Sequence, residues 1–488
     1  MRDSLLRLTN FIDGDYRAPL SNAYLPVVEP ATGKSFAEVP DSGAADIDAA
    51  VAAATRAQRA WAQTAPSQRA TLLRRIADVI ETRLDALAEE ESRDSGKPVK
   101  VARSVDIPRA VANFRFFAAM AESFASESHQ GEVGTLNYTL RQPLGVVGCI
   151  SPWNLPLYLL TWKIAPALAA GNCVIAKPSE VTPVSAWLLG EIVQAAGLPP
   201  GVLNIVQGGG PRCGQPLVTH PKIKAISFTG STATGGAIAA ATATQFKKLS
   251  LEMGGKNATV VFADCDFERT VAESVRAAFS NQGQICLCGS RILVERSLLP
   301  RFREAFLARV KELKVGDPRD PASDIGAVVS AAHLAKVQSY IDLAHEEGGR
   351  LLAGGQRLKV DGRCSEGYFL APTVFDQLDA HCRVNQEEVF GPLVTLVPFD
   401  DEAQALAFAN STQYGLACSV WTGDLARAHR FAAAVEAGVV WINCWMARDL
   451  RTPFGGVKHS GLGREGGMDG MRFFSEPKNV AIHYGSGK

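Results

Sequence analysis

The stretch that decides the fold is GVVGCISPWNLPLYLLTWKIAPALAAGNCVIAKPSE, residues 145–180. It begins with GVVGCI, a short and wholly apolar run of the kind that forms a strand buried on both faces. Helical spacing follows over 157–170, and NCVIAKPS predicts a second strand. A strand, a helix and a strand in this order predict a right-handed crossover between two parallel strands.

The same alternation continues toward the C-terminus. A helical stretch at 184–196 is followed by the strand LNIVQG, a further helix, the strand AISFTG, a helix at 235–244 and the strand KKLSLEM. Repeated strands and helices predict an α/β protein with a doubly wound parallel sheet. Such a sheet binds nucleotides at the carboxyl ends of its strands.

A second alternation starts at Asn257. It runs from TVVFAD through SRILVE and VTLVPF to CSVWTG and GVVWINC. We therefore expect two α/β domains that join near residues 253–257. The C-terminal KNVAIHY alternates as an edge strand does, which suits pairing across a subunit interface.

The bulk composition narrows the class of protein. Among 488 residues, 47% are apolar and 20% are charged, and the formal net charge is +0. No strongly basic run stands out, so nucleic acid is not an expected partner. The most apolar region, 144–176, contains Lys163, Gly171 and three prolines, so we expect no membrane helix.

The N-terminal MRDSLLRLTNFIDGDY has no apolar core long enough for a signal peptide. We therefore expect a cytoplasmic protein. Its ten cysteines form no CxxC pair, and free thiols are the default in a reducing compartment.

Two of these cysteines stand two positions apart in FSNQGQICLCGSR, residues 279–291. A metal site needs three or four clustered ligands, and a disulfide between such near neighbours is strained. Two buried apolar thiols are the common alternative. Cys286, however, follows the polar turn NQGQ and is expected to enter a strand next, which can expose one thiol at a domain cleft. We expect Cys288 to pack nearby.

A nucleophilic thiol also needs a base and donors for an oxyanion. Glu252 ends the strand in LSLEMGGK, and Asn154 follows a buried strand in ISPWNLP. An ordinary strand-end carboxylate and a turn asparagine before proline are the alternative interpretations. FTGSTATGG is a loose phosphate-site signal, and AKPSE places Lys177 and Glu180 at another strand end, where the alternative is two surface residues.

Taken together, seven motifs resemble the aldehyde dehydrogenase superfamily over essentially the whole chain. They are SPWNLP, AKPSE, FTGST, LEMGGKN, NQGQIC, EEVFGP and PFGGVKHSG, in the family's order and spacing. The resemblance implies a Rossmann-type cofactor domain at 1–120 and 141–252 and an α/β catalytic domain at 253–445. It further implies an oligomerisation element at 121–140 and 465–488, and assembly as a homodimer or homotetramer.

The same resemblance implies catalytic roles and the cofactor NAD, without a metal. Cys286 is expected to be the nucleophile and Glu252 the general base. The Asn154 amide and the Cys286 backbone N–H are expected to form the oxyanion hole. The residues expected to bind the cofactor are Ile150, Ser151, Trp153, Lys177, Ser179, Glu180, Gly210, Phe228, Gly230, Ser231, Glu388 and Phe390.

Two less generic stretches point to the substrate. DIPRAVANFRFFA contains Arg109, and INCWMARDLRTPFGG contains Arg448 and Arg451. An arginine in an apolar tunnel favours an anion, because burying it unpaired is costly and its planar fork fits a carboxylate. The alternative is an ion pair within the chain, for instance with Asp106 or Asp449.

Within the family, these stretches resemble the 2-aminomuconic and 2-hydroxymuconic semialdehyde dehydrogenases. That resemblance implies a small semialdehyde substrate with a carboxylate held by Arg109 and Arg448, with Phe454 beside them. NQGQICLC favours the amino compound, whereas RDLRT is typical of the hydroxy branch.

Three other functions stay open. A broad-specificity or betaine-type aldehyde dehydrogenase is opposed by the two arginines, which repel a cation. A silent structural protein on this fold is opposed by the intact set Cys286, Glu252 and Asn154. A coenzyme A-acylating enzyme is opposed by Glu252, whose presence favours hydrolysis.

Overall fold

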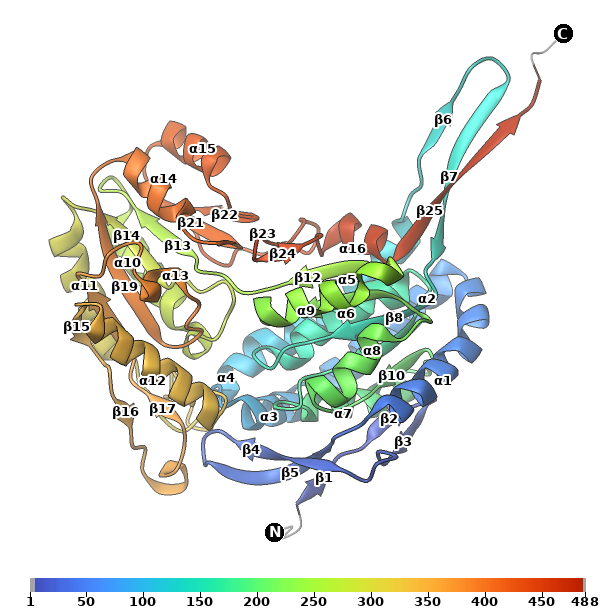
Figure 1. Ribbon diagram of the computed structural model, residues 1–488, viewed down its shortest axis with the longest axis horizontal. Coiled ribbons are helices and arrows are strands. Elements are labelled where there is room, and N and C mark those ends of the chain that lie inside the picture. The colour runs from blue at the N-terminus through green and yellow to red at the C-terminus, as the bar shows by residue number, and fades with distance from the viewer. Residues whose placement is uncertain (1–4, 486–488) are drawn as a thin grey trace.

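Five parallel strands form the centre of the first sheet in the computed structural model, which describes residues 5–485 (Figure 1). Their spatial order is β12 (Lys248–Glu252), β11 (Ile223–Thr229), β8 (Val146–Ile150), β9 (Cys173–Lys177) and β10 (Leu203–Ile205). The predicted doubly wound parallel sheet is thereby confirmed. Distant segments add antiparallel edges: β24 (Gly461–Leu462) on one side, and β2 (Asn10–Ile12) with β3 (Asp15–Arg17) on the other.

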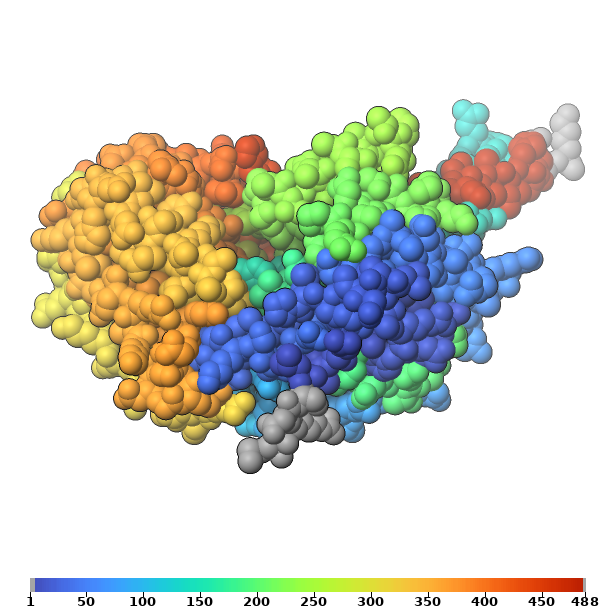
Figure 2. All heavy atoms as spheres, turned by 60° about the horizontal axis from the view of Figure 1, so that its bottom comes forward, coloured from blue at the N-terminus to red at the C-terminus, as the bar shows by residue number. Residues whose placement is uncertain are grey.

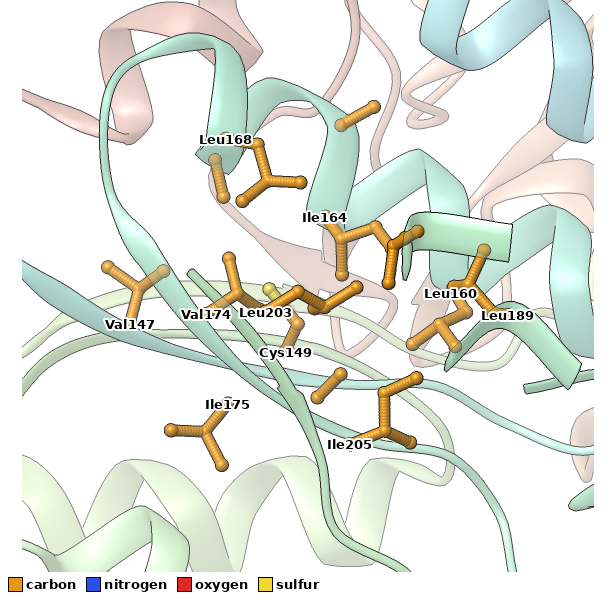
Figure 3. Packing of buried hydrophobic residues seen from close by; sticks show 14 of the residues in the cluster. Val147, Cys149, Leu160, Ile164, Leu168, Val174, Ile175, Leu189, Leu203 and Ile205 are labelled. Carbon is orange, nitrogen blue, oxygen red and sulfur yellow. The ribbon is translucent and has the colours of Figure 1, made fainter. Parts of the chain in front are cut away.

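The centre of this sheet is buried on both faces, because every residue of β8 and β9 is buried. Figure 3 shows Val174 and Ile175 pointing to opposite sides of the sheet, with Ile164 of α6 (Pro156–Ala169) on one of them. Other helices of this region are α1 (Ala44–Gln63), α2 (Pro66–Thr82), α3 (Leu84–Ser95), α5 (Ile107–Ser123), α7 (Val184–Ala195), α8 (Gln215–Thr219) and α9 (Thr232–Thr242). A small sheet of β1 (Leu6–Arg7), β5 (Lys34–Pro40) and β4 (Tyr24–Glu29) lies near the N-terminus.

The second alternation forms a separate sheet, and Figure 2 shows its yellow and orange residues beside the blue N-terminal ones. Its parallel strands are β18 (Thr373–Asp376), β19 (Leu393–Phe399), β14 (Arg291–Glu295), β13 (Ala258–Val261), β21 (Ala417–Trp421) and β22 (Val439–Ile442). β15 (Arg350–Ala353) pairs antiparallel at one edge. The helices are α10 (Phe267–Phe279), α11 (Leu299–Glu312), α12 (Ala331–Glu346), α13 (Arg383–Gln386), α14 (Glu402–Asn410) and α15 (Leu425–Ala434).

A three-stranded ribbon projects from the body at the upper right of Figure 1. β25 (Ser475–His483) pairs antiparallel along its whole length with β7 (Thr135–Pro143), which also pairs with β6 (Ser128–Gln130). α16 (Gly467–Phe473) precedes β25. The first residues of the predicted segment 1–120 and the last of 465–488 lie outside the described residues.

Candidate active site

The predicted site residues of the first sheet share its carboxyl edge. Register places Ile150 of β8 opposite Lys177 of β9 and Phe228 of β11, and Thr229 opposite Glu252 of β12. Because these strands are parallel, their carboxyl ends form one row across the sheet. The backbone N–H of Ser151 donates to the Lys177 carbonyl at 3.1 Å, which holds the adjoining turns together.

Cys286 lies in a tight turn rather than at the start of a strand. After α10 the backbone turns left-handed at Asn281, Gln282 and Gly283, with φ of 51°, 58° and 69°. β14 begins only at Arg291, so the prediction that Cys286 enters a strand directly is wrong. The reason is local, because three left-handed residues reverse the chain before any pairing with β13 or β19 starts. Cys288 is buried, and its Sγ faces the Ser280 carbonyl at 3.8 Å.

Two side chains that sequence reasoning missed hold this turn. The Asn257 amide Nδ2 donates to the carbonyls of Cys286 at 2.7 Å and Cys288 at 3.0 Å. The Trp445 indole donates to the carbonyl between them, on Leu287, at 3.0 Å. The position of Asn257 directly after GGK, in the motif LEMGGKN, was the available signal. Three fixed carbonyls leave the thiol little freedom to move.

Cys286 lines two cavities at once. The wide cavity, of about 230 Å³, is lined by Pro152, Trp153, Asn154, Thr229, Gly230, Ser231, Met253, Gly254, Cys286, His333, Lys336, Glu388 and Phe390. The narrow cavity, of about 20 Å³, is lined by Leu155, Tyr158, Leu159, Trp162, Thr229, Glu252, Met253, Ile285, Cys286, Leu287, Met446, Arg448, Phe454 and Glu465. A thiol shared by two cavities can react with a group from one while a second molecule occupies the other.

Asn154 directs its side-chain amide at the turn that carries Cys286. Its Nδ2 donates to the Gln284 carbonyl at 2.9 Å, which uses one of the two amide hydrogens. Between residues 5 and 485, the backbone N–H of Cys286 has no acceptor. The second Asn154 hydrogen and this N–H are therefore available as donors beside the thiol.

Glu252 is a buried carboxyl without a hydrogen-bond partner among the described residues, and it is 3% exposed. Burial, followed by the nearby Glu465, raises its pKa well above the usual range, although Lys163 opposes this. Gly455 permits the close approach, since its backbone has φ of 154° and a Cβ there would lie 2.6 Å from Glu252 Oε1. Such a carboxyl takes up a proton readily, as a general base must.

The Cys286 thiol is protonated at rest, because burial raises its pKa to about 12. Glu388 and Glu252 raise this pKa further, whereas the positive charge of Arg448 lowers it. Attack by sulfur therefore requires a base or an added positive charge in the cavity.

Glu388 and Phe390 line the wide cavity, and two backbone features, a glycine at 254 and a left-handed φ at Phe390, allow this. A Cβ at Gly254 would lie 2.0 Å from Glu388 Oε2, so only glycine admits the carboxylate, which accepts from the Gly255 N–H at 2.9 Å. Phe390 has a left-handed φ of 62° and its ring meets Trp153 edge-on at 5.2 Å.

Two residues of α12 that sequence reasoning missed hold this segment. Lys336 donates to the Glu388 carbonyl at 3.0 Å, and His333 Nε2 lies 2.6 Å from the Phe390 carbonyl. Burial lowers the pKa of His333 to about 4, so the ring is neutral and its Nε2–H donates.

The remaining predicted cofactor residues lie outside the wide cavity, along the same sheet edge or the turns after it: Ile150, Ser151, Lys177, Ser179, Glu180, Gly210 and Phe228. Lys177 Nζ approaches Glu180 Oε2 at 3.4 Å, and the turn 210–214 faces it, since a Cβ at Gly214 would lie 3.8 Å from the lysine side chain. Ser231 caps α9 through the Thr234 N–H at 3.2 Å. A carboxylate can accept hydrogen bonds from ribose hydroxyls, and a helix N-terminus can bind phosphate. These groups therefore fit a dinucleotide.

Arg448 lines the narrow cavity, and Arg109 lies against two of the rings that line it. The Arg448 guanidinium lies 4.0 Å from the Phe454 ring centroid, and that of Arg109 lies 5.5 Å and 5.7 Å from the rings of Tyr158 and Trp162. Burial lowers the pKa of Arg109, and repulsion from Arg448 adds to this. The two cations are therefore near each other.

Neither arginine has a carboxylate partner within the described part of the chain. Asp106 pairs with Lys97, and Asp449 pairs with the exposed Arg451 at 2.6 Å. Nε and Nη2 of Arg109 are buried without an acceptor in that part of the chain. The internal ion pairs that were the alternative are thus not formed, and two cations without an ion-pair partner lie at the narrow cavity that Cys286 lines.

The aldehyde dehydrogenase family matches residues 16–480 of the chain. A 2-aminomuconic semialdehyde dehydrogenase of Mus musculus is 49% identical over 483 residues, which cover 98% of this chain and 99% of the mouse protein. A 2-hydroxymuconic semialdehyde dehydrogenase of Pseudomonas sp. (strain CF600) is 44% identical over 97% of this chain and 99% of its own.

Among solved structures, PnpE of Pseudomonas sp. WBC-3, crystallised with nicotinamide adenine dinucleotide, superposes with a TM-score of 0.96. It is 42% identical, and the superposition covers 98% of each chain. The resemblance that the seven motifs predicted is thereby confirmed. A match from residue 16 to residue 480, with relatives of this identity and coverage, shows that the chain belongs to the aldehyde dehydrogenase family.

Proposed function

We propose that this protein oxidises 2-aminomuconic 6-semialdehyde to the dicarboxylic acid with NAD⁺ and water. The observation that carries this proposal is the pair of unpaired arginines, Arg109 and Arg448, on the substrate side of the Cys286 thiol. A carboxylate at the far end of the substrate would supply the anion that both lack. The relatives named above act on semialdehydes of this class.

The steps follow from the two cavities. Cys286 loses its proton and its sulfur adds to the aldehyde carbon, while Asn154 Nδ2 and the Cys286 N–H donate to the new oxyanion. One such donor lowers a barrier by about 3 kcal/mol. Bound NAD⁺ would supply the acceptor for the hydride of the thiohemiacetal, and Cys286 would then carry a thioester.

Glu252 then takes a proton from water, and the hydroxide cleaves the thioester. The carbon–sulfur bond breaks, and sulfur regains a proton. In total, aldehyde, water and NAD⁺ become carboxylate, NADH and two protons.

For the cofactor, we propose that Glu388 and Phe390 hold the nicotinamide ribose and that Lys177 and Glu180 hold the adenosine ribose. Gly230 and Ser231 would lie under the pyrophosphate at the N-terminus of α9. NAD is supported by the complex of PnpE, and by Glu180, which disfavours a 2′-phosphate.

We further propose a homodimer or homotetramer, with 121–140 and 465–488 as the assembly element. The projecting ribbon of β6, β7 and β25 supports this, because its exposed apolar side chains include Leu136, Leu140 and Ile482. Residues 1–120 with 141–252 would form the cofactor domain, and 253–445 the catalytic domain. A cytoplasmic location suits the ten free thiols.

Steady-state formation of NADH tests the substrate. We would compare 2-hydroxymuconic semialdehyde, a stable stand-in, with a neutral aldehyde of similar length, in the wild type, Arg448→Met and Arg451→Met. Loss of one charged hydrogen bond should lower kcat/KM of Arg448→Met for the carboxylated substrate about 10- to 100-fold. Arg451→Met is the matched control, since Arg451 is exposed and paired.

An equal loss of kcat/KM on both aldehydes in Arg448→Met would contradict the binding of a substrate carboxylate by this arginine. The function would then be general aldehyde oxidation. To distinguish the two muconic semialdehydes as substrates, kcat/KM is also measured with the amino compound, which is generated immediately before mixing. We expect its kcat/KM to exceed that of the hydroxy compound, and the reverse order would favour the hydroxymuconic alternative.

A helix long and apolar enough to cross a bilayer is not found among residues 5–485.

A further inference from the structure

A charged ammonium group is buried beneath the segment that carries Asn154. Lys97 is 0% exposed, and its Nζ donates to the Asp106 carboxylate and, at 3.0 Å, to the backbone carbonyl of Asn154. Lys97 follows Gly96, whose φ of 77° ends α3. Burying an ion pair carries a large desolvation penalty and seldom adds stability by itself. We therefore expect the ion pair to have a role other than stabilising the fold.

The Asn154 carbonyl receives a second donor from the turn before Cys286. Asn281 Nδ2 donates to it at 3.1 Å and also to the Gln284 carbonyl at 3.2 Å. The Gln284 carbonyl in turn accepts from Asn154 Nδ2 at 2.9 Å. Asn154 is thus fixed at both ends, by its carbonyl and by its side-chain amide.

A carboxyl group beside the ion pair holds the continuation of the same segment. Glu91 Oε2 accepts from the Leu157 N–H at 3.2 Å, in the first turn of α6. Burial, followed by the nearby charge of Asp106, raises the pKa of Glu91 to about 7, so the two carboxyls lie close together. Residues 154 and 157 are therefore held by one buried cluster, formed by Glu91, Lys97 and Asp106.

We infer that Lys97 is a positioning residue of the oxyanion hole, acting through the Asn154 peptide. Its ammonium fixes the Asn154 carbonyl, which orients the peptide so that Nδ2 points toward the turn of Cys286. Asp106 holds the ammonium in place. Without Lys97, the Asn154 peptide can rotate and carry its amide away from the developing charge.

This inference rests on the proposed aldehyde oxidation, and it predicts a rate effect rather than a binding effect. A misplacement of about 1 Å costs on the order of 100-fold in rate. We expect Lys97→Met to lower the rate of the NADH burst about 10- to 100-fold, with KM for aldehyde and cofactor little changed. Lys100→Met is the matched control, because Lys100 is exposed and pairs with Asp324 at 2.9 Å.

A double-mutant cycle in the full-length chain tests the route through Asn154. The variants are Lys97→Met, Asn154→Ala and the double variant, and the measurement is the burst rate at saturating substrate. We expect Lys97→Met to change the burst rate less than about threefold in the Asn154→Ala background. An equal fold-loss in both backgrounds would overturn the inference and assign Lys97 to the fold.

Asp106→Asn provides a second cycle if Lys97→Met does not fold. It keeps the shape of the side chain, removes the charge that holds Lys97, and should again lose its effect when Asn154 is Ala. Activity of the wild type and of Lys100→Met on a semialdehyde tests the proposed function separately. An inactive wild type would refute that function, whereas additive losses in an active enzyme refute only the role of Lys97.

Discussion

The two cavities that meet at Cys286 are built in different ways. The wide cavity of about 230 Å³ is lined by strand ends, the start of α9 and polar or aromatic side chains such as His333, Lys336 and Glu388. The narrow cavity of about 20 Å³ is lined mainly by aliphatic and aromatic side chains, with Arg448 and Glu252 among them. Because most of the lining differs between the two, a substitution can alter one cavity and leave the other unchanged.

The largest expected effect comes from Cys286, whose thiol lines both cavities. Cys286→Ala should lower turnover at least ~1000-fold, because no other sulfur can hold the acyl group. Steady-state NADH formation measures it. Cys288→Ala is the control, since Cys288 is buried and faces Ser280, and it should keep most activity. Substantial turnover in Cys286→Ala would show that the reactive group is not the thiol at which the two cavities meet.

A change confined to the narrow cavity should separate the two half-reactions. Glu252→Gln should give one burst of NADH and then a steady rate ~100- to 1000-fold below the wild type, because the thioester is not hydrolysed. Rapid-mixing absorbance measures both phases. Steady turnover at the full rate would remove Glu252 from its proposed role.

The pH dependence of the wild type bears on the same carboxyl. Burial raises the pKa of Glu252, so the basic form is lost at a higher pH than for an exposed glutamate as the solution is acidified. The steady-state rate should therefore fall on acidification from an apparent pKa above the usual range for glutamate. A steady-state rate that falls only near the usual pKa of glutamate on acidification would contradict this prediction.

A change confined to the wide cavity should affect the cofactor. In Gly254→Ala, the new Cβ would lie 2.0 Å from Glu388 Oε2 and must displace that carboxylate. Loss of the proposed contact between Glu388 and the nicotinamide ribose should raise KM for NAD⁺ on the order of tenfold. Gly236→Ala is the matched control, because no atom lies within 4 Å of a Cβ there. Equal KM values in both variants would show that Glu388 does not bind the cofactor.

The smallest effect sharpens the comparison, because one charged residue of each cavity acts on the thiol and the two act with opposite signs. Arg448 lowers the pKa of Cys286 and Glu388 raises it. Alkylation of Cys286 near neutral pH should slow roughly two- to fivefold in Arg448→Met and accelerate by a similar factor in Glu388→Gln. Arg451→Met should leave it unchanged. Shifts of the same sign in both variants would contradict this electrostatic picture.

The sequence by itself determined the α/β class, the two alternations and the row of strand ends, because these follow from local periodicity. The sequence also identified the family, through seven short motifs that occur in the family's order. Buried runs such as GVVGCI allow few other structures, so their strands could be predicted without any long-range contact.

Only the tertiary structure decided what surrounds the thiol. Asn154 and Cys286, more than a hundred residues apart in the sequence, line one cavity, and Glu252 and Cys286 line the other; no local pattern encodes either contact. The left-handed turn at 281–283, which made the strand prediction at Cys286 wrong, depends on contacts with Asn154. Asp449 pairs locally with Arg451, and only the fold shows that none of the other described carboxylates forms an ion pair with Arg448. Pairing and burial are long-range properties, and therefore only the folded chain settles them.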